Sequence, residues 1–211
     1  MLPAELTEHI RRAAVTPFGD EGKLLPSLSA VATNVRKSNT SKGAGQRYWY
    51  MLPDFAPRHK PDLFIARVNS ARPKAVLNEQ RGALVDANFA TLWLTKPDES
   101  LSNMLLAYLS STLAWTIFEF VGAVMGGGAL KLEATHLASF PVPKFTPKAK
   151  AKLTELGAKL CQHDSSESAA VRAAIDQVVC SEVVGNKNWV LGLNTLKSMA
   201  QTKLDARRFR V

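Results

Sequence analysis

The run of apolar residues at 101–121, LSNMLLAYLSSTLAWTIFEFV, constrains the fold more than any other part of the chain. Its length approaches that of a membrane-spanning helix. It nevertheless carries Asn103, Glu119 and a polar triplet at 110–112, and such groups are costly inside a lipid bilayer. We therefore predict one long helix buried in the core of a soluble domain and ending near Gly122.

Four short runs of apolar, aromatic or β-branched residues precede this segment, separated by Pro, Asn and Gly. They are RYWYMLP at 47–53, DLFIARV at 62–68, KAVLNE at 74–79 and FATLWLT at 89–95. Runs of this kind between turn residues are typical of strands, so we predict a small, irregular and mostly antiparallel sheet. Residues 1–46 predict a lead-in of helix and loop, with weak helices near 6–14 and 28–36.

Both ends of the long helix carry recognisable signals. Asp98 or Ser100 can cap its start, because either side chain can accept a hydrogen bond from a free backbone amide. After its end, the glycine triplet at 126–128 removes side-chain restraints from the backbone, and Pro141-Val142-Pro143 stops the segment that follows. Between the glycines and the prolines we expect a short strand and a one-turn helix.

Beyond Pro147 the pattern is helical. Apolar residues recur with helical spacing at Leu153, Leu156 and Leu160, and again at Val171, Ile175, Val178 and Val179. These stripes predict a hairpin of two antiparallel helices joined by the polar turn HDSSES, with a third helix over 188–204. The chain is thus predicted to be an α+β protein in three parts: the lead-in at 1–46, an α+β domain at 47–146 and a helical tail at 147–211.

The balance of charge points to a polyanionic partner. Lys and Arg number 27 against 18 acidic residues, a formal net charge of +9, which favours nucleic acid over a membrane surface or an acidic protein. Cys161 and Cys180 are too few for a disulfide framework, and we expect both to be reduced and packed inside helices. Because the N-terminal residues lack the apolar segment of a secretory leader, we expect a cytoplasmic location.

A search for catalytic groups is mostly negative. The stretch GAVMGGGA is not preceded by the acidic-ended strand of an S-adenosylmethionine-binding loop, a P-loop is absent, and the histidines stand singly. Pro53-Asp54 and Pro61-Asp62 supply half of a metal-dependent nuclease motif, but the acidic-x-Lys element Glu21-Gly22-Lys23 precedes them. We predict no catalytic, cofactor-binding or metal-binding residue. A nuclease and a non-catalytic protein-interaction domain remain the alternatives.

The middle of the chain interleaves cations with aromatic residues, as DNA-binding surfaces do. Lys and Arg bind phosphates, Arg can also pair with guanine, and planar rings can stack on bases. The candidates for DNA contact are Lys42, Arg47, Trp49, Arg58, Lys60, Arg67, Arg72, Lys74 and Lys131. Each ring could instead belong to the core, and each loop cation could be a solvated surface charge.

An ordered set of motifs adds a family resemblance. The set is Leu109-Ser110-Ser111, the glycines at 126–128, Leu132 and Leu137, Pro141-Val142-Pro143, and then Arg172, Ile175 and Asp176. Over about residues 47–184 it resembles the C-terminal region of adenine-specific DNA methyltransferases, whose pattern has Leu-Asn-Ser at the first of these places and Pro-Ile-Pro at the stop.

The resemblance implies a target-recognition domain that selects double-stranded DNA for adenine methylation in a bacterial restriction-modification or phage-defence system. It also implies a methyltransferase catalytic domain or subunit as a partner, with no membrane involved. The chain lacks the Asp/Asn-Pro-Pro-Tyr/Phe motif that holds a flipped adenine. S-adenosylmethionine is therefore expected on the catalytic partner and no cofactor is expected in this chain.

Overall fold

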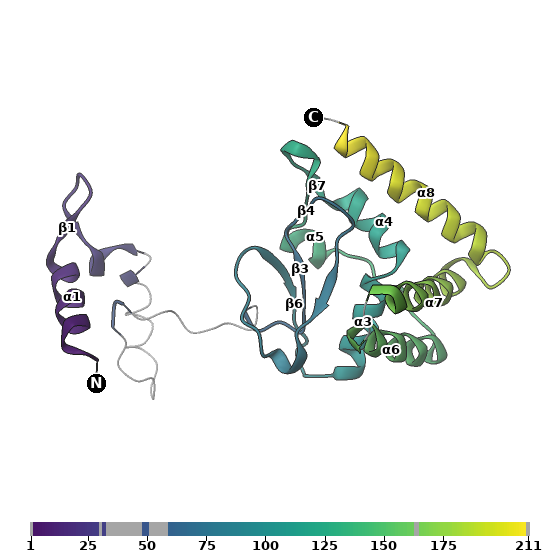
Figure 1. Cartoon of the computed structure of the whole chain (residues 1–211), viewed down its shortest axis with the longest axis horizontal. Coiled ribbons are helices and arrows are strands. Elements are labelled where there is room, and N and C mark those ends of the chain that lie inside the picture. The colour runs from purple at the N-terminus through teal and green to yellow at the C-terminus, as the bar shows by residue number, and fades with distance from the viewer. Residues whose placement is uncertain (1, 30, 33–47, 51–58, 163–164, 210–211) are drawn as a thin grey trace. The chain divides into compact units, whose positions relative to one another are not determined.

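The computed structural model of the chain describes residues 2–29, 31–32, 48–50, 59–162 and 165–209. The chain forms two compact units, Met1–Asp54 and Phe55–Val211, whose elements are labelled in Figure 1. Helices and small antiparallel sheets occur together, so the predicted α+β class is confirmed.

The first unit contains a helix followed by a short hairpin. Helix α1 spans Ala4–Val15, where the sequence predicted a helix, and none of its residues is buried. Strands β1 (Pro17–Phe18) and β2 (Lys23–Leu24) pair antiparallel, and the short 3-10 helix η1 (Leu25–Ser27) follows them. This hairpin contributes little apolar burial, since the residues of both strands are exposed.

The predicted strand at 47–53 is wrong where the structure describes it, because residues 48–50 lead into a turn. The rings of Tyr48 and Tyr50 stack with their centroids 5.5 Å apart, and Trp49 meets Tyr50 edge-on at 5.9 Å. The three rings thus pack on one another locally. The rest of the predicted strand lies outside the described residues.

Two small antiparallel sheets form the β part of the second unit. In the first, β3 (Leu63–Ala66) lies between β5 (Ala75–Leu77) and β6 (Phe89–Leu92). In the second, β8 (Leu130–Lys131) lies between β4 (Val68–Asn69) and β7 (Ala123–Val124). The prediction of small, mostly antiparallel strands in this region is confirmed. The 3-10 helix η3 (Glu79–Arg81) follows β5.

The apolar run forms two helices, so the prediction of one long helix is wrong. Helix α3 spans Glu99–Leu109 and α4 spans Thr112–Val121, and the two are bent by 70° relative to each other. Asp98 caps α3, as predicted, by accepting a hydrogen bond from Leu101 N. The break arises because Ser111 has an extended backbone and starts a new helix, its hydroxyl accepting from Ala114 N.

No single described helix is long and apolar enough to cross a membrane, although α3 and α4 taken together reach that length and composition.

The glycine triplet forms the turn of a small hairpin between β7 and β8. It folds into a 3-10 helix, η4 (Gly126–Gly128), in which Gly127 and Gly128 adopt φ values of +72° and +70°. A Cβ atom on Gly128 would lie 2.6 Å from the carbonyl oxygen of Arg207. Glycine is therefore needed at this position both for its left-handed backbone and for the close approach of a distant segment.

The segment after this hairpin ends on the Pro-Val-Pro stop, as predicted. It forms the short helix α5 (Ala134–Ala138). The hydroxyl of Tyr108 in α3 donates to the carbonyl oxygen of Pro141 at 2.5 Å, and burial raises the pKa of Tyr108 to about 12. The Pro-Val-Pro segment is thus attached to the core by the hydrogen bond from Tyr108, whose hydroxyl keeps its proton at neutral pH.

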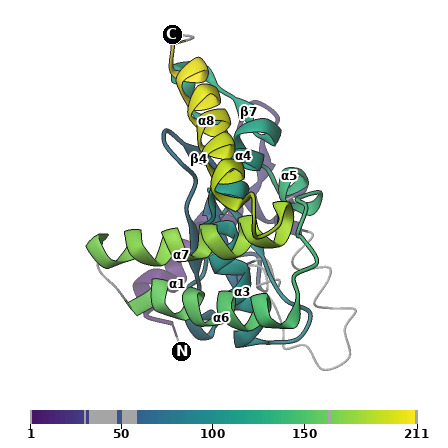
Figure 2. The same cartoon turned by 90° about the vertical axis from the view of Figure 1, so that its right-hand side faces the viewer.

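Three long helices complete the chain and confirm the predicted helical tail. They are α6 (Pro147–Gln162), α7 (Ser165–Val184) and α8 (Trp189–Arg208). Helix α6 packs against α3 and α7, while α8 packs against α4 and α7. Figure 2 shows α8 running over α4, with α7 lying across below the lower end of α8. Both cysteines are free, but only Cys180 is buried; Cys161, expected inside a helix, is exposed near the end of α6.

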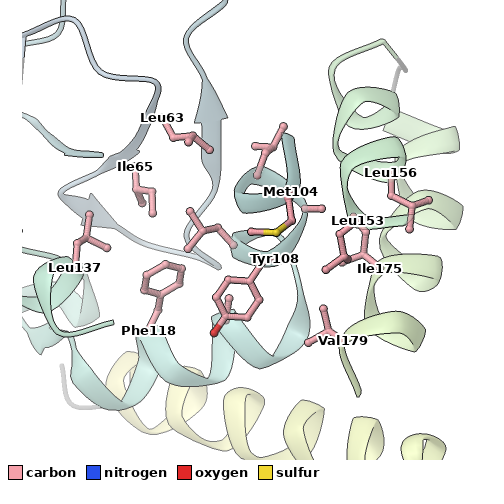
Figure 3. Close-up of a cluster of buried hydrophobic side chains, with 14 of the residues drawn as sticks. Leu63, Ile65, Met104, Tyr108, Phe118, Leu137, Leu153, Leu156, Ile175 and Val179 are labelled. Atoms are coloured by element: carbon pink, nitrogen blue, oxygen red, sulfur yellow. The ribbon is translucent and has the colours of Figure 1, made fainter. Parts of the chain in front are cut away.

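One hydrophobic core joins the first sheet to the helices. Leu63 and Ile65 point from β3 toward α3, whose own buried side chains face α6 and α7 on the other side. The core residues labelled in Figure 3 are Leu63, Ile65, Met104, Tyr108, Phe118, Leu137, Leu153, Leu156, Ile175 and Val179. The apolar stripes predicted at 153–160 and 171–179 are thus the stripes that the helical hairpin buries.

Candidate nucleic-acid interface

The nine predicted DNA-contact residues fall into three groups. Lys42, Arg47 and Arg58 lie outside the described residues, and Trp49 belongs to the first compact unit. The other candidates, Lys60, Arg67, Arg72, Lys74 and Lys131, belong to the second unit. Two of these, Arg67 and Lys131, lie together.

Arg67 and Lys131 share one carboxylate where the two sheets meet. Arg67 lies between β3 and β4, and its backbone oxygen accepts from Leu132 N at 2.7 Å, which places it beside β8. Its guanidinium lies 3.3 Å from Glu133 Oε1, and Lys131 Nζ approaches the same oxygen to 2.5 Å. Arg67 also donates to the carbonyl of Ala87 at 2.9 Å, so Ala87 and Glu133 together fix the position of its guanidinium.

The charges of this basic cluster, defined as Arg67, Lys131 and Glu133, do not balance. The hydrogen bond from Lys131, reinforced by the charges of Lys131 and Arg67, lowers the pKa of Glu133 below its usual value. Glu133 is therefore ionised at neutral pH, and two cations face one anion. All three side chains remain partly accessible, with 32%, 35% and 40% of their surface exposed. A phosphate oxygen can compete for both cations in this arrangement.

The first sheet presents a second face, away from the core. Alternation along β3, β5 and β6 places Phe64, Val76 and Thr91 on this face, opposite the buried Leu63 and Ile65. Phe64 meets Phe89 edge-on at 5.0 Å, and Trp93, just after β6, is 49% exposed. The face therefore offers partly exposed aromatic rings, which suit contact with bases or sugars.

Lys60 and Lys74 lie at the ends of strands of this sheet. Lys60 precedes β3, Lys74 directly precedes β5, and both side chains are exposed. They are placed as solvated surface cations, which is compatible with phosphate contact and with the alternative that they have no binding role.

Arg72 lies apart from the basic cluster, against the helices. Its guanidinium donates to the carbonyl of Ser110 and lies 5.2 Å from the centre of the Trp115 ring. Burial lowers its pKa below the usual arginine value. Arg72 is therefore surrounded by helices, whereas Arg67 lies between strands β3 and β4.

Several polar residues with structural roles were not predicted from the sequence. Glu119 of α4 and Arg207 of α8 form a buried bidentate ion pair, with N–O distances of 2.9 and 3.1 Å. Arg207 also donates to the carbonyl oxygens of Asn69, Ala71 and Gly128. The sequence offered one signal for this pair. Glu119 is a carboxylate in an apolar run, and a buried carboxylate requires a partner of opposite charge.

Asp176, one of the residues that carry the family resemblance, has a clear structural role. Its carboxylate accepts from Thr112 N at 2.6 Å and from the Thr112 hydroxyl at 2.7 Å. It therefore caps the start of α4 from α7, next to the Ser111 cap. This contact joins the start of α4, directly after the Leu109-Ser110-Ser111 motif, to α7, although Thr112 and Asp176 are 64 residues apart in the chain.

Asp62, considered for a nuclease site, is engaged in structure. It forms a bidentate pair with Arg81, at 3.0 and 2.9 Å, and accepts from Leu94 N at 2.6 Å. The other aspartate of that motif, Asp54, lies outside the described residues. Among the described residues there is no group of three or more His, Cys, Asp or Glu side chains placed to hold a metal ion.

Comparison with known proteins adds one match. The family model described as type II methyltransferase M.Eco57I, C-terminal domain, matches residues 34–180. No curated protein and no solved structure shows a significant match to the chain. The matched range contains both sheets of the second unit and the helices from α3 through most of α7.

Proposed function

Since the chain belongs to the family of the C-terminal domain of type II methyltransferase M.Eco57I, we propose that it recognises double-stranded DNA for a methyltransferase catalytic domain or subunit. The resemblance to adenine-specific enzymes makes adenine the proposed target base, with S-adenosylmethionine bound by the catalytic partner. We also propose a role in a bacterial restriction-modification system, which the same family context supports.

The basic cluster carries this proposal. Arg67, between the two sheets, and Lys131, in the second sheet, converge on a single carboxylate, and the open sheet face with Phe64 and Trp93 belongs to the same unit. Cations held in fixed positions can bind backbone phosphates and set the position of a protein on the duplex. The net charge of +9 adds the longer-range attraction that brings DNA to the surface.

The direct test is the double replacement Arg67→Gln with Lys131→Gln. We expect DNA affinity to fall roughly tenfold and the slope of log affinity against log salt to decrease in magnitude by about 2, one for each lost phosphate contact. Fluorescence anisotropy with a labelled duplex at several salt concentrations measures both quantities.

The helical hairpin provides a matched control for this experiment. On α6, Lys152 and Lys159 contact the single carboxylate of Glu155 at 2.8 and 2.6 Å, which repeats the charge pattern of the basic cluster on the exposed side of a helix. The pair Lys152→Gln with Lys159→Gln removes the same net charge and should leave the salt slope nearly unchanged. Equal losses in the two double variants would mean that DNA responds only to net charge.

Replacing Glu133 by glutamine tests the same cluster in the opposite direction. Glu133 competes with phosphate for Arg67 and Lys131, so its neutralisation is expected to raise DNA affinity roughly threefold or more. The same anisotropy titration measures the change, and Glu155→Gln on α6 is the control. If affinity rose equally in both variants, the cations beside Glu133 would have no special role in DNA contact.

A further inference from the structure

A cleft between α4, α7 and α8 contains cations that the basic cluster does not include. Its volume is about 550 Å³, and its polar lining includes Arg72, Arg172, Asp176, Lys197, Ser198 and Gln201. The three helices that form it contact one another in pairs, and Figure 2 shows α8 over α4 with α7 at the lower end of α8. The cleft therefore belongs to the ordered helical part of the second unit.

Arg72 is the most buried cation of this cleft. Its guanidinium lies over the Trp115 ring and donates one hydrogen bond, to the carbonyl of Ser110. Burial is the main cause of its lowered pKa, and the nearby charge of Arg172 lowers it further, against the opposing effect of Asp176. A guanidinium has five N–H donors, so most of its hydrogen-bonding capacity is not used by these contacts.

Among the described residues that line the cleft, Asp176 is the only carboxylate, and it is already hydrogen-bonded. Both oxygens of Asp176 accept hydrogen bonds from Thr112 at the start of α4. Within the part of the chain that the structure describes, Arg72, Arg172 and Lys197 form no ion pair with a carboxylate. Three cations thus face one carboxylate, and that carboxylate serves as a helix cap.

Arg172 and Lys197 are exposed to solvent, whereas Arg72 is partly buried and is the cation that an added anion would stabilise most. A partly buried cation loses hydration, and an uncompensated one destabilises the folded state. A phosphate group would restore the balance, since it carries up to two negative charges and several acceptor oxygens that an arginine can bind in pairs. The Ser198 hydroxyl and the Gln201 amide in the lining can donate to further oxygens.

We propose that the cleft between α4, α7 and α8 is a phosphate-binding site, with Arg72 at its base and Arg172 and Lys197 at its sides. The bound group is the phosphate of a DNA backbone or of a free nucleotide, which share this chemistry. The evidence for a phosphate site does not depend on the proposed function. Only the assignment of the bound phosphate to DNA rests on that function.

Inorganic phosphate is the probe that tests the site without DNA. The indole N–H resonance of Trp115, identified by its loss in Trp115→Phe, reports on the ring beneath Arg72 in two-dimensional NMR of the full chain. We expect a saturable shift of this resonance with a dissociation constant on the order of millimolar, at an ionic strength held constant with chloride. Absence of a saturable shift would overturn the proposal.

Two variants of the same helix locate the binding. Lys197→Gln removes a cation from the cleft and is expected to weaken phosphate binding at least about threefold. Lys203→Gln also removes a cation from α8, but Lys203 lies over the Phe120 ring and does not line the cleft. The Lys203→Gln variant should therefore bind phosphate as tightly as the wild-type chain. Equal weakening by the two variants would show a general charge effect and would overturn the site.

A competition arm distinguishes the two sources of phosphate. If a short DNA duplex displaces inorganic phosphate from the wild-type chain more strongly than a mononucleotide of equal phosphate concentration, the site takes a backbone phosphate. Displacement by the mononucleotide alone assigns the site to a free nucleotide. A chain that binds phosphate here but binds no DNA would contradict the proposed function and would leave the phosphate site intact.

Discussion

Replacing Gly157 by alanine is expected to lower the free energy of unfolding by about 3 kcal/mol or more. Gly157 lies in α6 where it crosses α3, and an added Cβ would lie 1.9 Å from the carbonyl oxygen of Asn103 and 2.6 Å from its carbonyl carbon. These are backbone atoms of a buried helix and cannot rotate away, so α6 must move off α3. Urea denaturation followed by circular dichroism measures the loss.

The control is another helical glycine. At Gly192 in α8 an added Cβ would meet the side chain of Val184, with its nearest atom 2.9 Å away. That methyl group can move, and alanine is favoured over glycine in a helix by about 1 kcal/mol. Gly192→Ala should therefore be neutral within about 1 kcal/mol or slightly stabilising. Similar stabilities for the two alanine variants would mean that α3 and α6 do not need their close contact.

Replacing Arg207 by methionine is expected to destabilise the second unit by about 3–5 kcal/mol, because it leaves the Glu119 carboxylate buried without its partner. The side chain of Arg207 is 2% exposed and that of Glu119 is not exposed at all. The same change removes the donors to three backbone carbonyls, so β4 and η4 lose these hydrogen bonds to α8. Thermal and urea denaturation measure the effect.

Arg208→Met is the matched control, since Arg208 is the next residue and donates only to the exposed carbonyl of Ser70. It should cost less than about 1 kcal/mol. Adding Glu119→Gln to Arg207→Met should recover part of the loss, because the double variant contains no buried unpaired charge. A double variant as unstable as the sum of the two single changes would show that the pair is not coupled.

Local patterns predicted most of the elements of this fold. The stripes in α6 and α7 follow from helical spacing, and the strands β3, β5 and β6 follow from short apolar runs between turn residues. The break between α3 and α4 escaped prediction, because a serine pair is compatible with a continuous helix until its hydroxyls act as caps. Asp176, which secures that break, lies 64 residues further along the chain from Thr112.

The candidate sites were less predictable, because they depend on which distant residues meet. Arg67 and Arg72 are five positions apart and looked equivalent in the sequence, yet Arg67 pairs with Glu133 beside a sheet while Arg72 lies over Trp115 in a helical cleft. No spacing rule distinguishes the two, since their environments come from β8 in one case and α4 in the other. Tertiary contact decides the role of each cation.

The buried ion pair also bears on the order in which the protein assembles during synthesis. The partners of the Arg207 side chain precede it by 79 to 138 residues, and the Glu119 carboxylate precedes it by 88. A nascent chain that has already formed α4 therefore carries a carboxylate whose counter-charge has not yet been translated. The core of the second unit can close around Glu119 only when α8 has emerged, so its docking comes late in folding.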